Sequence, residues 1–127
     1  ENWGYSRLYK AIRKESIDEM KHAEKVIARL LYLGGIPNMA RYFEIRVGTN
    51  VQEMLENDLA LEEEAIERLN TCIQLAHTHK DFGSSELLES ILSDEEEHID
   101  WIEAQLDQVQ QIGIGGYLAQ QIKLDDE

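Results

Sequence analysis

The sequence has almost no cysteine or proline, and it lacks any long run of apolar residues. Cys72 is the only cysteine, so the chain cannot form an internal disulfide, and we expect a reducing compartment, namely the cytoplasm. We expect Cys72 itself to be a small buried residue and not a nucleophile. No apolar run approaches the ~20 residues that a membrane-spanning helix needs. These absences favour a helical protein without a membrane span.

Basic residues are also scarce. The chain has 12 Lys and Arg against 26 Asp and Glu, which gives a formal net charge of −14. Nucleic acids and anionic membranes are bound through Lys and Arg, so this balance argues against both as partners. It is compatible with cations as ligands. The length of 127 residues fits a single domain over residues 1–127.

Apolar residues recur with a helical period in three long segments. Gly34-Gly35-Ile36-Pro37 ends the first segment, Asn50 is a good N-cap for the second, and Gly113 breaks the third. Residues 36–49 show no helical period, and a connection of this length fits a crossover that runs along a bundle. The sequence therefore predicts an all-α antiparallel helical bundle with a long crossover. The predicted helices cover about 3–33, 51–79 and 84–112, with a short final helix over 117–122.

Glutamates interrupt the apolar stripe of each predicted helix. Because successive helical residues rotate by ~100°, Glu19, Glu62 and Glu95 each fall within the stripe of their own helix. His22 and His98 follow the first and third of these glutamates by three residues and lie at the stripe's edge. Other acids are expected on solvated surfaces or facing a solvent-filled interior: Glu15, Glu63, Glu64, Asp94 and Glu97.

These five residues form a metal-ligand pattern. A lone buried carboxylate is costly, and a core ion pair would explain one such glutamate but not three at one level of a bundle. Two Glu-x-x-His pairs and a further glutamate provide oxygen and nitrogen ligands without thiolate, which suits iron or manganese and, less specifically, zinc. Such a set lacks only one carboxylate of a di-iron carboxylate centre in a four-helix bundle.

Longer stretches of the sequence resemble the bacterioferritins, the haem-containing ferritins. The segments "ESIDEMKHAEKVIARLLYLGGIPN", "EMLENDLALE" and "DEEEHIDW" carry the resemblance, which extends over nearly the whole chain to "GYLAQQIK". The resemblance implies a ferritin-like bundle and a homo-oligomeric 24-subunit cage. It also implies iron storage and detoxification, with a di-iron ferroxidase centre that oxidises Fe(II) and a ferric mineral deposited inside.

The resemblance also implies a role for each site residue. Glu19 and Glu95 would bridge the two irons, His22 and His98 would each ligate one iron, and Glu62 would be a terminal ligand. Met20 would be the axial ligand of a b-type haem at a twofold interface between subunits. The haem would carry electrons for iron release, with a ferredoxin-type protein as donor.

Two departures from the family pattern affect these expectations. The family's first bundle helix, which carries the remaining glutamate ligand, is absent before Asn2, and the chain begins without methionine, so we expect an incomplete or processed sequence. An accessory iron site of some members would use Lys14 and Asp18, where the lysine would repel iron. Two alternatives stay open: a non-catalytic haem-binding or structural subunit with an incomplete metal site, and a di-iron peroxidase or oxygenase.

Overall fold

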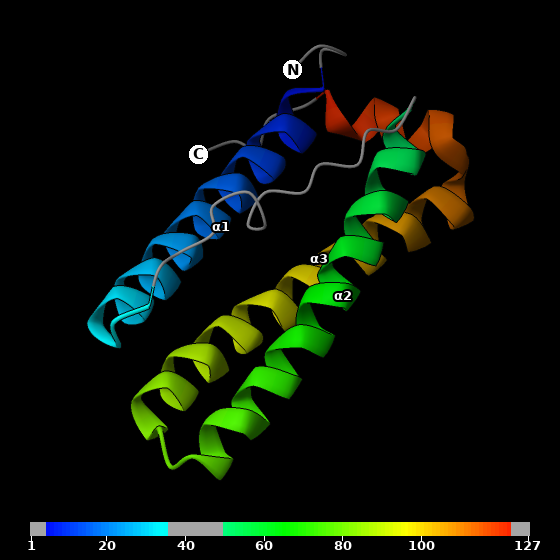
Figure 1. The fold of residues 1–127 in the computed structure, drawn as a ribbon. Helices are drawn as coiled ribbons and strands as arrows, with labels where there is room; N and C mark the ends of the chain where they lie inside the picture. The colour runs from blue at the N-terminus through cyan, green and yellow to red at the C-terminus, as the bar shows by residue number, and fades with distance from the viewer. Residues whose placement is uncertain (1–4, 36–49, 123–127) are drawn as a thin grey trace.

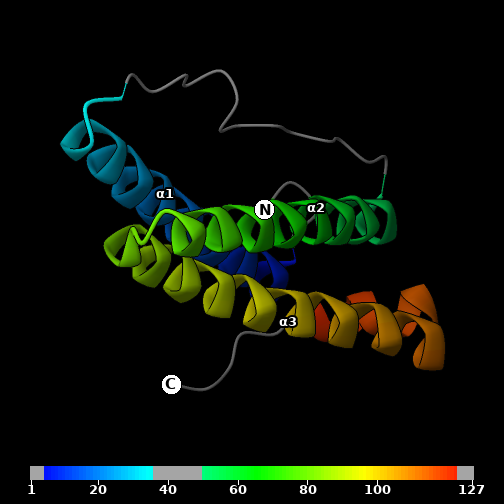
Figure 2. The same ribbon diagram turned by 60° about the horizontal axis from the view of Figure 1, so that its bottom comes forward.

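The computed structural model describes residues 5–35 and 50–122, and all three long elements in them are helices. Helix α1 covers Ser6–Tyr32, α2 covers Val51–Thr78 and α3 covers Phe82–Gln121. Figures 1 and 2 show α1 and α2 running in the same direction and α3 running against both. The predicted all-α antiparallel bundle is confirmed, and none of the described helices is long and apolar enough to cross a membrane. The predicted crossover and the start of the first predicted helix lie outside the described residues.

The helix ends follow from local hydrogen bonds. Asn50 caps α2, because its side-chain oxygen accepts a hydrogen bond from the Glu53 N–H at 2.8 Å. At the end of α1, Gly34 takes a left-handed φ of 84° and the Gly35 N–H donates to the Leu30 carbonyl at 2.8 Å. Helix α3 starts at Phe82, two residues before the predicted start, because Asp81 accepts a hydrogen bond from the Ser84 N–H and acts as the N-cap.

Gly113 interrupts α3, as the sequence predicted. Its φ of 78° and ψ of 158° are not helical, so the chain bends there and continues as a short terminal helix. In Figure 1 this terminal part, coloured orange to red, turns back toward the start of α1. The turn buries Tyr117 completely in the main hydrophobic cluster, which also contains Leu8, Val51, Leu55, Ile102 and Val109.

Helix α3 is the neighbour shared by the other two helices. It packs against α2 along its length and against α1 more sparsely, whereas no described Cα atom of α1 lies within 8 Å of one in α2. Only Leu8 and His22 of α1 are buried, and the rest of its predicted apolar stripe is half-buried. Cys72 is exposed, so the prediction that it is buried was wrong.

Candidate metal centre

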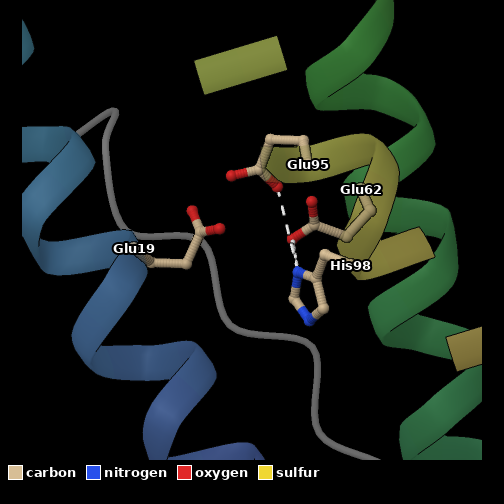
Figure 3. A group of neighbouring side chains, drawn as sticks. All are labelled: Glu19, Glu62, Glu95 and His98. Carbon is tan, nitrogen blue, oxygen red and sulfur yellow. Dashed lines mark ion pairs between the residues drawn. The ribbon is translucent and has the colours of Figure 1, made fainter. Parts of the chain in front are cut away.

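The structure brings the five predicted metal ligands together from three helices. Glu19 and His22 come from α1, Glu62 from α2, and Glu95 and His98 from α3. Figure 3 shows four of them pointing toward one another, and one ligand atom from each of these four lies within 4.8 Å of all the others. Glu62 and Glu95 are buried, with 7% and 3% of their surfaces exposed, whereas the Glu19 side chain is 46% exposed.

Both histidines turn the same ring nitrogen toward the carboxylates. The Nδ1 atom of His22 lies 3.1 Å from Glu95 Oε1 and 4.0 Å from Glu19 Oε1. The Nδ1 atom of His98 lies 3.2 Å from Glu62 Oε1 and 3.9 Å from Glu95 Oε2. Glu95 therefore faces one imidazole with each of its two oxygens.

Two further carboxylates hold the outer ring nitrogens. His22 Nε2 lies 2.9 Å from Asp94 Oδ2, and His98 Nε2 contacts Glu15. A carboxylate at Nε2 keeps the proton on that nitrogen, which leaves Nδ1 with a lone pair for a metal.

The sequence analysis missed both of these carboxylates. Glu15 was expected on a solvated surface, yet its side chain is only 14% exposed. Its position four residues before Glu19 places it on the same face of α1, and this spacing could have revealed it. Asp94 is exposed, as expected, and nothing in the helical period indicated its bond to His22. Glu97 is exposed, also as expected.

The burial of so many acids shifts their protonation. Burial, together with the charges of Glu19 and Asp58, raises the pKa of Glu62 to about 8. Burial also raises the pKa of Glu19, and burial together with Lys14 lowers the pKa of His98 to about 4. Each shift penalises the charged form of the group, as expected where a compensating charge is missing.

The buried oxygens of the centre also lack hydrogen-bond donors. Among the described residues, Glu62 Oε2 and Glu95 Oε2 are buried without a hydrogen-bond partner. Buried acceptors without donors are rare in folded proteins. A bound cation would satisfy both oxygens and reverse the burial penalty, so the donor set fits a metal ion.

Asp58 extends the acidic cluster and was not predicted. It is half-buried on α2, four residues before Glu62, and it groups with Glu15 and His98 within 4.8 Å. Burial and the charge of Glu19 raise the pKa of Asp58. The carboxylates therefore continue beyond the five predicted ligands.

Met20 lies on an exposed face of α1. It is 55% exposed, and three other exposed large apolar residues, Tyr9, Ile17 and Leu31, share its face at spacings of 11, 3 and 11 residues. We call these four residues the Met20 face. A contiguous apolar face of this kind on a surface helix is typical of an interaction site.

Comparison with known proteins agrees with this geometry. The family described as the ferritin-like domain matches residues 1–112. The bacterioferritin of Mycobacterium leprae is 46% identical over 120 residues, which are 94% of this chain and 76% of that protein. The bacterioferritin of Streptomyces coelicolor is 45% identical over 116 residues, 91% of this chain and 70% of that protein. The bacterioferritin of Mycobacterium avium is 42% identical over 120 residues, again 94% of this chain and 76% of that protein. These matches confirm the resemblance seen in the sequence, and the chain belongs to the ferritin family and, within it, to the bacterioferritins.

Proposed function

We propose that this chain oxidises Fe(II) at the carboxylate centre and stores the ferric product. The observation that carries the proposal is the meeting of Glu19, Glu62, Glu95 and His98, whose ligand atoms all lie within 4.8 Å of one another. Membership of the ferritin family supports iron storage as the wider role. The oxygen-rich ligand set without thiolate suits iron.

The contacts support a distinct role for each ligand. Glu95 faces His22 with one oxygen and His98 with the other, at 3.1 and 3.9 Å, as a carboxylate bridging two ions would. Glu62 lies against His98 alone, at 3.2 Å, which suits a terminal ligand of the iron on that side. We assign Glu19 as the second bridging carboxylate, since its 4.0 Å contact with His22 places it on the open side of the same cluster.

The substrate chemistry needs two ferrous ions at one place. Each Fe(II) gives up one electron, so two ions together reduce dioxygen to hydrogen peroxide with the uptake of two protons, or reduce hydrogen peroxide to two water molecules. Hard carboxylate ligands favour Fe(III) over Fe(II), which drives the oxidation. Asp94 and Glu15 orient the two imidazoles throughout by holding their Nε2 atoms.

The Met20 face supports the proposal of a haem between two copies of this chain. Met20 is 55% exposed within an apolar surround, so the residues present fit one thioether from each copy and an apolar ring between them. When bound, the haem would supply one-electron transfer for iron release, with a ferredoxin-type protein as donor. The proposed assembly is a 24-subunit cage in the cytoplasm. A reduced-minus-oxidised spectrum tests the ligand, because Met20→Leu should abolish the haem bands, and unchanged bands would contradict the assignment.

Stopped-flow oxidation of added Fe(II) tests the main proposal. The Glu95→Ala and His98→Ala double variant should oxidise iron about a hundredfold more slowly than the parent chain, because ligand and bridge are both lost. Glu97→Ala, an exposed change one residue before His98, serves as the matched control and should leave the rate unchanged. Equal rates in the double variant and the parent would refute the ferroxidase role.

One observation favours a second reading. The Glu19 side chain is 46% exposed, and the described residues provide five ligands, one carboxylate short of the complete set. A non-catalytic haem-binding or structural subunit would follow if the centre does not hold two ions. Counting the equivalents of Co(II) that bind by visible absorption distinguishes the two, with two per chain supporting catalysis and none or one supporting the structural subunit.

A further inference from the structure

A groove between α1 and α3 gathers basic side chains in an otherwise acidic protein. Its volume is about 940 Å³. Five of the chain's 12 basic residues line it from α1, namely Arg7, Lys10, Arg13, Lys14 and Lys21. Four of them follow spacings of three, four and seven residues, which place them along one face of the helix. We call this feature the basic groove.

The acidic residues of the chain do little to neutralise the basic groove. Asp18 is the only carboxylate among its lining residues. Asp18 pairs with Lys14 at 3.1 Å, but the two side chains are 45% and 81% exposed, so solvent weakens the attraction. Five positive charges therefore share one groove with a single negative charge, in a chain whose formal net charge is −14.

Helix α3 adds neutral hydrogen-bond donors to the opposite wall. The Tyr117 hydroxyl donates to Gln105 Oε1 at 2.8 Å, which occupies the acceptor of that side chain and leaves its amide N–H groups as donors. Burial raises the pKa of Tyr117 to about 12, so the hydroxyl keeps the proton that it donates. Gln121 is only 5% exposed, and its Nε2 atom donates one long hydrogen bond, of 3.4 Å, to the Tyr117 carbonyl. The wall thus offers amide donors, one of them almost fully buried.

From this arrangement we propose that the basic groove binds inorganic phosphate. Guanidinium, ammonium and amide N–H groups are all donors, and a compact oxyanion with several acceptor oxygens satisfies them together. The same α1 side chains, Lys14 and Lys21, also line the adjoining cavity of about 450 Å³ that contains the carboxylate centre. Phosphate in the basic groove would therefore lie beside the centre without sharing its ligands.

Titration calorimetry with sodium phosphate, on the full chain without iron, tests the proposal. We expect saturable binding to the parent chain and at least an about tenfold loss of affinity in the double variant Lys10→Gln, Arg13→Gln, because each charged donor contributes substantially to oxyanion binding. These two residues line the basic groove but not the metal cavity, so iron oxidation in phosphate-free buffer should be unchanged. Failure of phosphate binding and failure of iron oxidation are thus measured separately.

The double variant Arg68→Gln, Lys80→Gln is the matched control. It removes the same net charge from exposed residues of α2 and of the turn before α3, outside the basic groove. Retained phosphate affinity in this control, with loss in the groove variant, supports the site. No saturable binding to the parent, an equal loss in both double variants, or equal displacement by chloride at the same ionic strength would overturn it.

Discussion

Glu62 shows how much of this protein's behaviour depends on single buried carboxylates. It lies in a cluster with two other glutamates and a histidine, and one of its oxygens has no hydrogen-bond partner among the described residues. Its folded-state pKa of about 8 lies well above the ordinary value of 4.5. The folded chain therefore retains a proton at this residue that the unfolded chain releases.

The stability of the metal-free protein should consequently fall as pH rises from about 5 to 8. The folded state binds more protons than the unfolded state in this window, so the free energy of unfolding decreases with pH, by on the order of a few kcal/mol. In Glu62→Gln, which cannot ionise, the decrease should largely disappear, and the variant should melt several degrees above the parent at pH 8. Thermal melts across this pH range in the presence of a chelator measure the effect.

Two comparisons keep this prediction specific. Glu97→Gln, an exposed change, should leave the pH profile of the parent unchanged. A divalent cation should restore the stability of the parent at pH 8, because the ion takes the place of the proton. Parallel pH profiles for Glu62→Gln and the parent would contradict the assignment of the shift to Glu62.

Among the elements, α3 depends most on a single backbone position. Gly113 has a φ of 78° and a ψ of 158°, a region that residues with a side chain occupy only at a cost. A Cβ atom at Gly113 would meet nothing within 4 Å, so any cost of substitution there is conformational and not steric. The bend at Gly113 is what returns Tyr117 to the hydrophobic cluster.

Gly113→Ala should therefore destabilise the chain by about 1–3 kcal/mol. Gly115→Ala is the matched control, since Gly115 also has open space around its Cα but no positive φ. We expect it to be neutral or slightly stabilising, because alanine favours the helical conformation. Urea unfolding followed by circular dichroism gives both values, and a smaller loss at Gly113 than at Gly115 would show that the bend is not needed.

The elements were largely predictable from the sequence, whereas the contacts between them were only partly so. Helix ends at Asn50, Gly34 and Gly113 are encoded locally, by a cap and by glycines, and the structure agrees with each of them. The helical period placed Glu62 and Glu95 inside the bundle because a stripe defines one direction only. It could not place Asp94, since a bond from an exposed carboxylate to His22 depends on how α1 and α3 face each other.

At the scale of the whole molecule, α1 is attached less firmly than the other helices. It packs against α3 and not α2, and Leu8 and His22 are its only buried residues. Two of the five proposed ligands, Glu19 and His22, nevertheless lie on it. Metal binding must therefore stabilise the attachment of α1 to the rest of the chain.

Hydrogen exchange should show this difference directly. Without metal, the amides of α1 should exchange faster than those of α2 and α3, because fewer buried contacts oppose the local opening of α1. Zinc, used as a redox-inert ion, should slow exchange in α1 more than elsewhere. Equal protection of all three helices without metal, or slowing by zinc that is uniform over the chain, would contradict this account.

The position of α3 as shared neighbour also sets an order of folding. Helices α2 and α3 are joined by a short turn and can pair early, as a local hairpin. The contacts of α1 with α3 join residues 52 to 73 positions apart, such as Arg29 with Asp81 and His22 with Glu95, so they close a long loop and should form last. A newly synthesised chain would then have no place where two ferrous ions can meet until its final folding step is complete.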